Sequence, residues 1–470
     1  MEGRRVVITG RGVCLPNANN TPNNVDVMMD NLYNGISSIE NVSGRFPWLK
    51  DYRSQIGSLF KDFKFDYEKF GMKEKDVRAL SPFVQYSLEA AHQAITESGF
   101  LNKNPDEIRD RTGVIVGQGL CGIIELEAQK EIQMNLKRLM ELKQLEYSQF
   151  QSSLKKLIET GELENILWNL GKGISRVSPL LCIKTIADSA AGFVANHWEL
   201  HGPSKSVSSA CATGADATAD AYNLIMMGYA DVMLGGGAVE SAASLIYASF
   251  GQPRALSERN NDALRASRPF DRDRDGFVIG EGAGILVLEE LEHAKARGAN
   301  ILGELLGYGA FTDATHPTKP RADAKYITMA METAIKRAGI NKEQIGYINA
   351  HGTSTPDGDG IECFGIKKVF GERAYKIPIS STKSMIGHTL SAAGAIELIV
   401  ALESVRNGKI HPTVNCDNPD TDVAYHKDFK EEQIRNFQPC DLDYVPNQAR
   451  EYTDEKGKSR IDYALSNAFG

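Results

Sequence analysis

The sequence predicts an α/β fold. Short apolar runs, typical of buried strands, alternate along the chain with longer segments whose apolar residues recur every three or four positions, as in amphipathic helices. Glycines follow most of the short runs, which is typical of strands that end in turns. The chain has 470 residues, which is enough for roughly two to four structural units or for one large duplicated domain. We therefore expect a large core of sheets covered by helices.

The composition argues against several functional classes. A formal net charge of -8 at pH 7 argues against a general nucleic-acid-binding surface, although a local basic patch could still receive an acidic partner. No run approaches the roughly 18 apolar residues of a membrane span. Residues 1–6 also lack the apolar core of a signal peptide, so we expect a cytoplasmic protein. Seven cysteines without paired CxxC spacing predict neither a disulfide framework nor a metal site.

The N-terminal part alternates strand and helix patterns. Residues 6–10 form a short apolar run closed by glycine, which predicts a buried strand. Gly10 and Gly12 begin like a dinucleotide-binding loop, but the third glycine of that fingerprint is missing and no helix follows at once. We therefore expect no cofactor loop there. Residues 78–99 predict an amphipathic helix that ends at a glycine, and residues 112–119 predict a second buried strand.

Residues 124–170 differ in character from the rest of the chain. This segment is charged, helix-favouring and almost free of glycine, and its apolar spacing predicts two amphipathic helices broken near Gly161. Two interpretations stay open. The helices could form a hairpin that docks a partner or caps the substrate, or they could be a surface insertion without a function.

The second part of the chain repeats the same alternation. Residues 230–237 predict a buried strand that ends in glycines. Residues 270–284 form a loop rich in Asp, Arg and Gly that resembles a calcium loop, but the distal glutamate and the flanking helices of such a loop are absent. A structural turn held by ion pairs is therefore the better interpretation. The remaining predicted elements are a strand at 284–288, a helix at 324–339 and a strand at 345–350.

A candidate nucleophile stands where a β-branched run gives way to a helix-like segment. Cys211 lies in this turn, and the helix pattern continues through Met227. The unpaired N–H groups and positive end of a helix favour a thiolate over a thiol. The small side chains beside the cysteine leave room for a substrate carbonyl, and backbone N–H groups there could hold the oxyanion formed on attack. The alternative is that Cys211 is only a small buried side chain.

Two histidines stand in glycine-rich and hydroxyl-rich turns further along the chain. His351 follows a predicted strand directly, and His388 lies in a similar turn. Lys383 precedes His388 and Glu397 follows it, so a cation and a carboxylate could orient an imidazole and fix its tautomer. Together with Cys211 these groups suit acyl transfer through a thioester. Spacing alone would also allow a thiol hydrolase that uses the cysteine and one histidine.

Several long motifs, in this order, resemble one family. They are the Val-Ile-Thr-Gly strand, the SSACATG turn around Cys211, the loop at 254–257, the segments 267–271 and 275–277, the HGTSTP turn that begins at His351 with Asp359 and Glu362 after it, and the STKSMIGH turn that ends at His388 with residues 392–395 after it. These motifs are similar to those of the β-ketoacyl-acyl-carrier-protein synthases. These enzymes are the condensing enzymes of the thiolase superfamily, and the likeness is closest to the elongating synthase I/II type.

The resemblance implies an architecture. A thiolase-like fold would have two duplicated α/β halves, 1–260 and 261–470, each with a mixed five-stranded sheet between helices. The 124–170 helices would be an insertion, and residues 422–438 a second one. The family continues beyond Gly470 with a glycine-rich turn and a last core strand, so we expect that the C-terminal half lacks this strand because the sequence is cut short. The alternative is an unusual C-terminus that leaves the oxyanion hole incomplete. Ile386 stands where the family usually has threonine.

The resemblance also implies a reaction and its residues. Cys211 would take the acyl chain from the phosphopantetheine arm of an acyl carrier protein. His351 and His388 would assist the decarboxylation of malonyl-carrier protein, and the carbanion would attack the acyl-cysteine to give a 3-ketoacyl product. No bound cofactor is implied, since 4'-phosphopantetheine arrives on the carrier protein. The other implied roles are a supporting pair near the second histidine, Lys383 and Glu397, pantetheine contacts from Thr353 and Thr355, an acyl-pocket gate at Leu120, and a carrier-protein contact at Arg254.

Alternatives remain within the same superfamily. A non-catalytic chain-length factor would keep the fold but usually replaces the nucleophile, whereas Cys211, His351 and His388 are all present. A biosynthetic thiolase or an initiating synthase fits less well, because the two-histidine turns with Lys383 favour the elongating type. The pathway stays open between fatty acid and polyketide or polyene synthesis. A homodimer is expected, and a heterodimer with a ketosynthase-like partner is the alternative.

Overall fold

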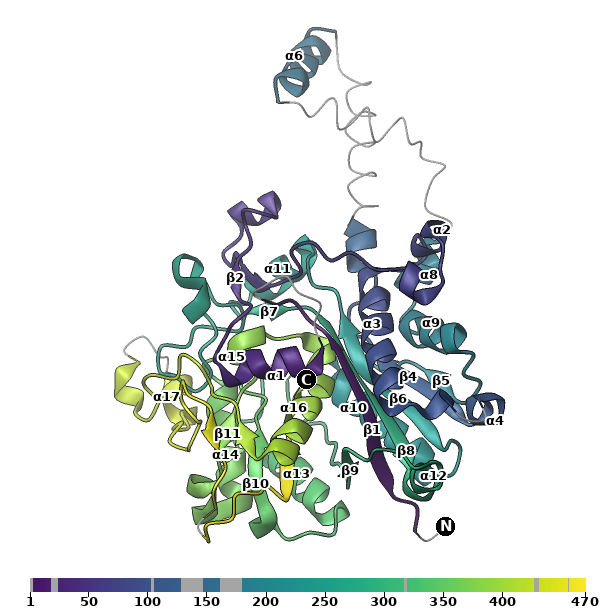
Figure 1. Cartoon of the computed structure of the whole chain (residues 1–470). Coiled ribbons are helices and arrows are strands. Elements are labelled where there is room, and N and C mark those ends of the chain that lie inside the picture. Colours follow the sequence, from purple (N-terminus) through teal and green to yellow (C-terminus); the bar gives the residue numbers. More distant parts are fainter. Residues whose placement is uncertain are drawn as a thin grey trace.

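The computed structural model describes residues 3–17, 24–102, 105–127, 147–160, 180–316, 319–426, 431–454 and 456–470. In this part of the chain, strands and helices alternate as the sequence predicts (Figure 1). The helices predicted over 124–170 lie mostly outside the described residues. Within the described part of that segment, α6 (Tyr147–Glu159) is helical and stands apart from the main body in Figure 1.

The larger sheet has six strands in the described residues, in the order β5-β4-β6-β8-β1-β9. The pairs β4–β5 and β4–β6 are parallel, whereas β8 pairs antiparallel with both β6 and β1. The central strands are buried along most or all of their length, which explains their continuous apolar sequence. The bounds are β1 Val6–Cys14, β4 Thr112–Gly117, β5 Ser204–Lys205, β6 Val232–Val239, β8 Gly282–Glu290 and β9 Gly303–Leu305.

A second sheet of three described strands lies in the order β11-β10-β14, and all its pairings are parallel. Its strands are β10 (Ile345–Asn349), β11 (Ile379–Ser380) and β14 (Tyr463–Ser466). Two small sheets complete the described strands. One joins β2 (Glu40–Asn41), β3 (Ile56–Ser58) and β7 (Ile279–Gly280), and the other joins β12 (Lys409–Ile410) and β13 (Arg450–Glu451).

The helices form layers around the two main sheets. Helices α3 (Pro82–Ser98) and α9 (Ser189–Trp198) cover one face of the larger sheet. Helices α10 (Thr213–Met226) and α16 (Ala393–Asn407) pack against its other face, and α16 also contacts β10 and β14 of the second sheet. These two helices therefore separate the sheets, and α13 (Lys325–Arg337) and α14 (Gly358–Phe370) pack beyond the second one (Figure 1).

Shorter helices connect these layers. They are α1 Val25–Tyr33, α2 Glu74–Val77, α4 Pro105–Asp110, α8 Leu181–Thr185, α11 Ser244–Gly251, α12 Leu291–Arg297, α15 Lys383–Ile386 and α17 Glu431–Asn436. The described 3-10 turns are η1 Pro47–Asp51, η2 Glu68–Phe70, η3 Phe100–Asn102, η4 Ala210–Ala212, η5 Asn260–Arg265, η6 Lys342–Gln344, η7 Gly371–Lys376, η8 Leu390–Ala392 and η9 Val423–Tyr425.

The sheets differ in detail from the arrangement that the sequence predicts. Six and three strands are described where five and five were expected. The strands β8 and β9 follow residue 260 in the chain but belong to the larger sheet, so the sheets do not separate at the predicted boundary between 260 and 261. The reason is the pairing of β8, which hydrogen-bonds to both β1 and β6 and closes the centre of that sheet.

Two glycines bring the separating helices α10 and α16 close together. A Cβ atom built on Gly394 would lie 2.7 Å from the backbone nitrogen of Ala215, and one on Gly214 would lie 2.9 Å from the backbone nitrogen of Ala395. No side chain fits into these gaps without moving the backbone. The close contact joins the start of α10, which follows Cys211, to the start of α16, which follows His388.

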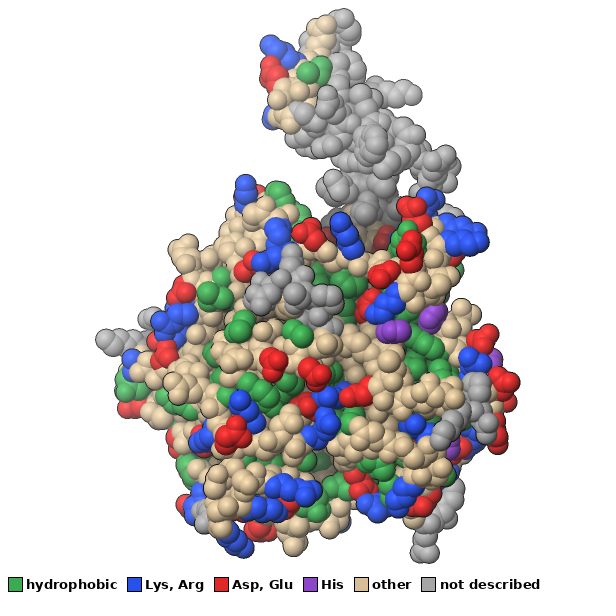
Figure 2. All heavy atoms as spheres, in the orientation of Figure 1, with side chains coloured by type: hydrophobic (Ala, Val, Ile, Leu, Met, Phe, Trp, Pro, Cys, Tyr) green, Lys and Arg blue, Asp and Glu red, His purple; other side chains and the backbone are tan. Residues whose placement is uncertain are grey.

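The described surface is of mixed charge. Acidic and basic side chains are interspersed on the face shown in Figure 2. Within the described ranges, no helix combines the length and apolar character that a membrane crossing requires. No group of three or more His, Cys, Asp or Glu side chains among these residues is arranged to hold a metal ion.

Candidate active site

Cys211 lies in the 3-10 turn η4, directly before α10. Ala210 adopts a left-handed backbone conformation with φ of 49°, which turns the chain sharply before the cysteine. Thr213 holds the turn, because its hydroxyl accepts from the backbone N–H of Ser209 at 2.8 Å and donates to the Ala210 carbonyl at 2.6 Å. The preceding strand β5 has only 2 residues and ends at Lys205. The predicted transition from strand to helix is therefore a short irregular segment.

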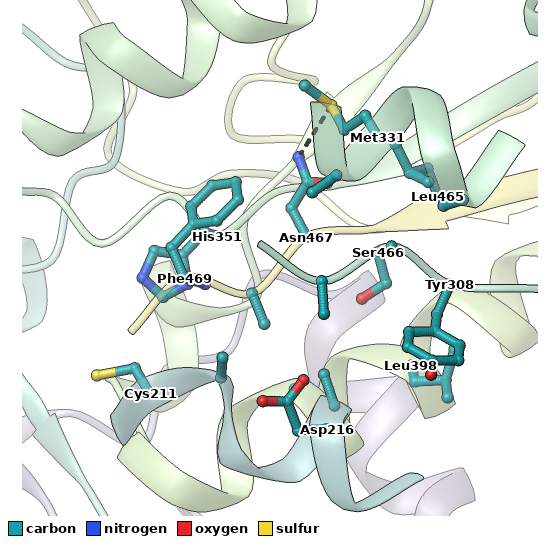
Figure 3. Close-up of a pocket in the computed structure, with 18 of the residues that line it drawn as sticks. Cys211, Asp216, Tyr308, Met331, His351, Leu398, Leu465, Ser466, Asn467 and Phe469 are labelled. Atoms are coloured by element: carbon teal, nitrogen blue, oxygen red, sulfur yellow. Dashed lines mark hydrogen bonds between the residues drawn. The ribbon is translucent and has the colours of Figure 1, made fainter. Parts of the chain in front are cut away.

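The two histidines come from equivalent places after strands of the second sheet. His351 follows β10 at its carboxyl end. His388 is separated from β11 by the short helix α15, which the sequence did not predict, and it precedes η8 and α16. The two rings lie 5.4 Å apart between centroids at an interplanar angle of 87°. Cys211 and His351 face the same cavity (Figure 3), and His388 also lines it.

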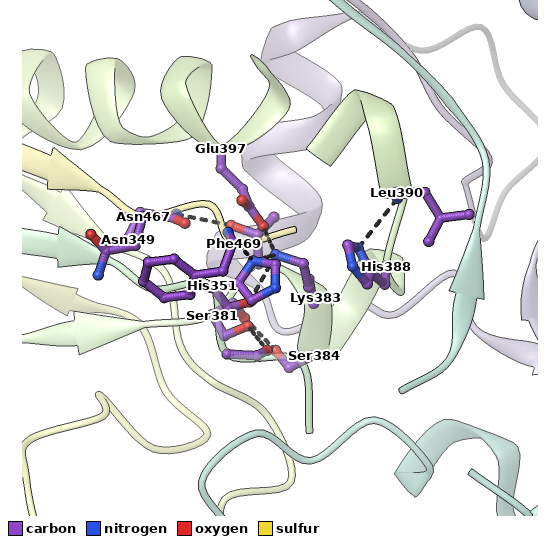
Figure 4. A network of polar contacts seen from close by, with 12 residues as sticks. Asn349, His351, Ser381, Lys383, Ser384, His388, Leu390, Glu397, Asn467 and Phe469 are labelled. Atoms are coloured by element: carbon purple, nitrogen blue, oxygen red, sulfur yellow. Dashed lines mark hydrogen bonds and ion pairs between the residues drawn. The ribbon is translucent and has the colours of Figure 1, made fainter. Parts of the chain in front are cut away.

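Backbone N–H groups fix the tautomer of both imidazoles. The N–H of Leu390 donates to Nδ1 of His388 at 3.2 Å, and the N–H of Phe469 donates to Nδ1 of His351 at 3.4 Å (Figure 4). A nitrogen that accepts a hydrogen bond carries no proton in the neutral ring, so Nε2 carries the hydrogen in each case. Each histidine thus has one N–H group that can donate to an oxyanion.

Lys383 and Glu397 form a buried pair beside His351, outside the cavity lining. Both side chains are buried and form an ion pair. The Lys383 ammonium also donates to the backbone carbonyl of His351 at 2.8 Å and lies 3.5 Å from its Nδ1 (Figure 4). Neither Lys383 nor Glu397 lines the cavity, so the pair acts on the histidine. The sequence prediction placed this pair near the second histidine, whereas the contacts are with the first.

Burial controls the protonation of the three central groups. It lowers the pKa of His351 and His388 well below the ordinary value, and the nearby Lys383 ammonium lowers both further. Both rings are therefore neutral near pH 7. Burial raises the pKa of the Cys211 thiol to about 11, and Lys383 opposes this rise only in part. The sequence predicted a thiolate favoured by the helix end, but desolvation outweighs that effect.

This pKa gives a pH-dependent reactivity of Cys211. The rate at which iodoacetamide alkylates Cys211 is expected to rise about tenfold per pH unit between about pH 7 and pH 10, because only the thiolate reacts. The labelled peptide identifies the site by mass, and a Cys211→Ala protein shows the background from the other cysteines. A rate that levels off below about pH 8 would show that the thiol ionises much more easily than its burial implies.

The other predicted site residues line the same cavity, whose volume is about 2750 Å³. Thr353 and Thr355 lie together there, with their hydroxyl oxygens 3.0 Å apart. Leu120 is half-buried in its wall and packs against the main apolar core. Arg254 is exposed at the cavity and has a left-handed φ of 58°. The structure therefore brings seven predicted residues to one cavity and places the Lys383–Glu397 pair behind it.

Other residues of the site were not assigned a role from the sequence. The Glu362 carboxylate accepts from the backbone N–H groups of His351 and Gly352 at 2.9 and 2.8 Å. The Asn467 side chain donates to the same carboxylate at 3.0 Å. Glu362 stands in the motif after His351, which was the available signal, but its contacts follow from helix packing that a pattern does not show. Ile386 is buried in the main apolar core.

The chain matches two protein-family models. The description "Beta-ketoacyl synthase, N-terminal domain" matches residues 3–294, and "Beta-ketoacyl synthase, C-terminal domain" matches residues 302–417. The passage from one model to the other falls near β9, where the larger sheet receives its last described strand along the chain. The models together cover most of the chain.

Curated and solved proteins agree with these models. The chain is 38% identical to "3-oxoacyl-[acyl-carrier-protein] synthase 2" of Synechocystis sp., covering 100% of this chain and 96% of that relative. A ketosynthase solved with its type II polyketide acyl-carrier protein gives a TM-score of 0.75 at 30% identity, covering 100% and 97%. The ishigamide ketosynthase/chain length factor gives a TM-score of 0.73 at 27% identity, covering 99% of this chain and 96% of that chain. These similarities confirm the predicted family and the thiolase-like fold class.

Proposed function

The chain belongs to the beta-ketoacyl synthase family, and on this premise we propose that Cys211, His351 and His388 carry out its reaction. The protein is an acyltransferase, a 3-oxoacyl-[acyl-carrier-protein] synthase of fatty acid biosynthesis. One observation carries the assignment of residues. A cysteine in a sharp turn before a helix shares its cavity with two neutral imidazoles whose tautomers are fixed by backbone N–H groups.

In the first step Cys211 receives the acyl chain. Its sulfur attacks the thioester carbonyl of the acyl-carrier protein, the carbon–sulfur bond to the pantetheine arm breaks, and the departing thiolate takes up the proton that Cys211 releases. The product is an acyl-cysteine and a free carrier-protein thiol. The turn held by Thr213 keeps the sulfur at the cavity wall during this exchange.

In the second step malonyl-carrier protein loses CO2. The carbon–carbon bond breaks, and its electron pair forms an enolate whose oxygen accepts from the Nε2–H groups of His351 and His388. The enolate carbon then attacks the acyl-cysteine carbonyl and expels the Cys211 thiolate, which takes up a proton from water. The result is a 3-ketoacyl-carrier protein that is two carbons longer. Neutral imidazoles suit this role, because each donates its Nε2–H to the enolate oxygen in a hydrogen bond and keeps its proton.

The predicted binding residues fit the arrival of a carrier protein at the cavity. The exposed Arg254 guanidinium can meet an acidic carrier protein, even though the whole chain carries a net charge of -8. The hydroxyls of Thr353 and Thr355 can bind the polar pantetheine arm. Leu120 offers an apolar contact to the acyl chain. The 4'-phosphopantetheine group belongs to the carrier-protein substrate and is not a cofactor of this chain.

We also propose a homodimer in the cytoplasm. Among the described strands, β5 lies at the edge of the larger sheet, and its exposed residues can pair with a strand of a second copy. A reduced Cys211 thiol is needed for acylation, and the cytoplasm keeps thiols reduced. The known ketosynthase/chain length factor pair makes a heterodimer the second candidate. Sedimentation of the purified chain distinguishes them, since a homodimer forms without a partner.

Product formation tests the proposed function. The purified protein, mixed with an acyl-carrier protein and malonyl-carrier protein, is expected to release CO2 and form a 3-ketoacyl-carrier protein two carbons longer, measured by mass spectrometry. A Cys211→Ala protein is the control. A folded dimer that forms no product at any acyl length would favour the non-catalytic chain-length factor instead.

A further inference from the structure

His411 is a buried histidine that the proposed reaction does not use. It follows β12 directly and is fully buried. Its Nδ1 lies 2.9 Å from the carbonyl oxygen of Pro412. A carbonyl can only accept, so Nδ1 carries the hydrogen and Nε2 holds a free lone pair. Burial lowers the pKa of His411 to about 4, so this nitrogen remains an acceptor near neutral pH.

Four polar groups surround that single nitrogen, three on strands β10 and β11 and one on Thr382, two residues after β11. The atoms are Ser380 Oγ at 3.2 Å, Tyr347 OH at 3.3 Å, Thr382 Oγ1 at 3.3 Å and Asn349 Nδ2 at 3.5 Å. The same groups also bond to one another. Tyr347 OH lies 2.9 Å from Ser380 Oγ, and Asn349 Nδ2 donates to Thr382 Oγ1 at 3.0 Å. His411 is therefore the centre of a closed polar cluster.

The cluster ties together the ends of two strands that lead into the active site. Tyr347 and Asn349 belong to β10, and Ser380 ends β11. Asn349 stands two residues before His351, and Thr382 stands directly before Lys383. The next residue after Thr382 makes the contact with His351, since the Lys383 ammonium donates to the His351 carbonyl at 2.8 Å (Figure 4). The distance between the Lys383 ammonium and the His351 carbonyl thus depends on how the cluster holds the ends of β10 and β11.

We propose that His411 is a positioning residue for the condensation step, holding the ends of β10 and β11 so that Lys383 and His351 keep their contact. This inference rests on the proposed function, since it assigns His351 to the second step. The Cys211 turn precedes α10 and shares no hydrogen bond with the cluster among the described contacts. Loss of His411 is therefore expected to impair condensation more than the acylation of Cys211.

The test compares the two half-reactions in a His411→Leu protein. Acylation of Cys211 by an acyl-carrier protein is measured by intact mass, and condensation is measured as 3-ketoacyl product. Condensation is expected to fall about 10- to 100-fold, because small displacements of reacting groups cost that much. Acylation is expected to stay within about threefold of the wild type, since its residues are not displaced. A His411→Gln protein, which regains an acceptor, is expected to recover most of the condensation rate.

Matched variants make the result specific. His426 lies in the same half, is largely buried and bonds to Asp420 Oδ1 at 2.8 Å, away from the cluster. A His426→Gln protein is expected to keep both half-reactions. Thr382→Val removes one hydroxyl of the cluster without changing the side-chain shape. If His411→Leu does not fold, this variant tests whether the cluster positions the groups for condensation. It is expected to lower condensation more than acylation.

Each outcome separates the inference from its premise. A wild-type protein that forms no product overturns the proposed function. If the wild type is active but folded His411→Leu condenses within about threefold of it, the positioning role is wrong. If acylation and condensation fall by the same factor and the thermal midpoint of the protein also drops, His411 only stabilises the fold. The inference is then also wrong.

Discussion

Replacing His351 or His388 with alanine is expected to lower the rate of condensation by about 100- to 1000-fold, the loss typical of one oxyanion donor. Each ring presents a single Nε2–H to the cavity, because a backbone N–H occupies its Nδ1. Without one ring, the enolate oxygen keeps only one donor. Acylation of Cys211 is expected to continue, since the thiol attacks a thioester before any enolate forms. Both steps are measured separately, by product mass and by intact protein mass.

A matched histidine controls for the loss of an imidazole. His293 of α12 bonds at 2.7 Å to Glu289, near the end of the central strand β8, and does not line the cavity. His293→Ala is expected to keep the condensation rate. A His351→Ala or His388→Ala protein that is folded and condenses as fast as the wild type would contradict the assigned donor roles.

Replacing Lys383 with methionine is expected to lower the free energy of unfolding by about 3–5 kcal/mol, which is the cost of leaving one member of a buried ion pair without its partner. Glu397 would then be a buried carboxylate without its cation. Burial already raises the pKa of Glu397, so the folded protein holds a proton that the unfolded chain releases. The stability of the variant is therefore greatest at low pH and falls as the pH rises through the raised pKa. Denaturant unfolding at about pH 6 and pH 9 measures this.

Two further proteins test the cause of that loss. Adding Glu397→Gln to Lys383→Met removes the unpaired charge, so the double variant is expected to regain stability and lose the additional pH dependence. The exposed pair Lys295 and Glu292, 2.8 Å apart, is the control. Lys295→Met is expected to change stability by less than about 1 kcal/mol. Equal stability of Lys383→Met at both pH values would contradict the buried ion pair.

Local sequence patterns predicted much of the fold. The apolar spacing in α3 and the continuous apolar runs in β4, β6 and β8 directly reflect burial on one or both faces. The site residues were also recognisable, because glycines and hydroxyl residues beside His351 and Cys211 mark turns where a substrate can approach. The motifs around them identified the family before any contact was known.

Long-range pairing explains what the sequence did not predict. Nothing in the run 282–290 shows that it pairs with β1, which lies far away in the chain, so the boundary between the sheets was misplaced. The partner of Lys383 is His351 rather than His388, because the packing of β10 beside β11 decides it. Burial likewise reversed the expected shift of the Cys211 pKa. His411 gave no signal, since its four partners come from two other strands and from the turn after β11.

The most direct test of the account is the intact mass of the protein after mixing with acyl-carrier proteins of several chain lengths. We expect the wild type to gain the mass of one acyl group, and the Cys211→Ala protein to gain none. The chain length that adds fastest would also reveal the substrate preference. A folded wild type that gains no mass, or a Cys211→Ala protein that gains the same mass, would contradict the assignment of Cys211 as the nucleophile.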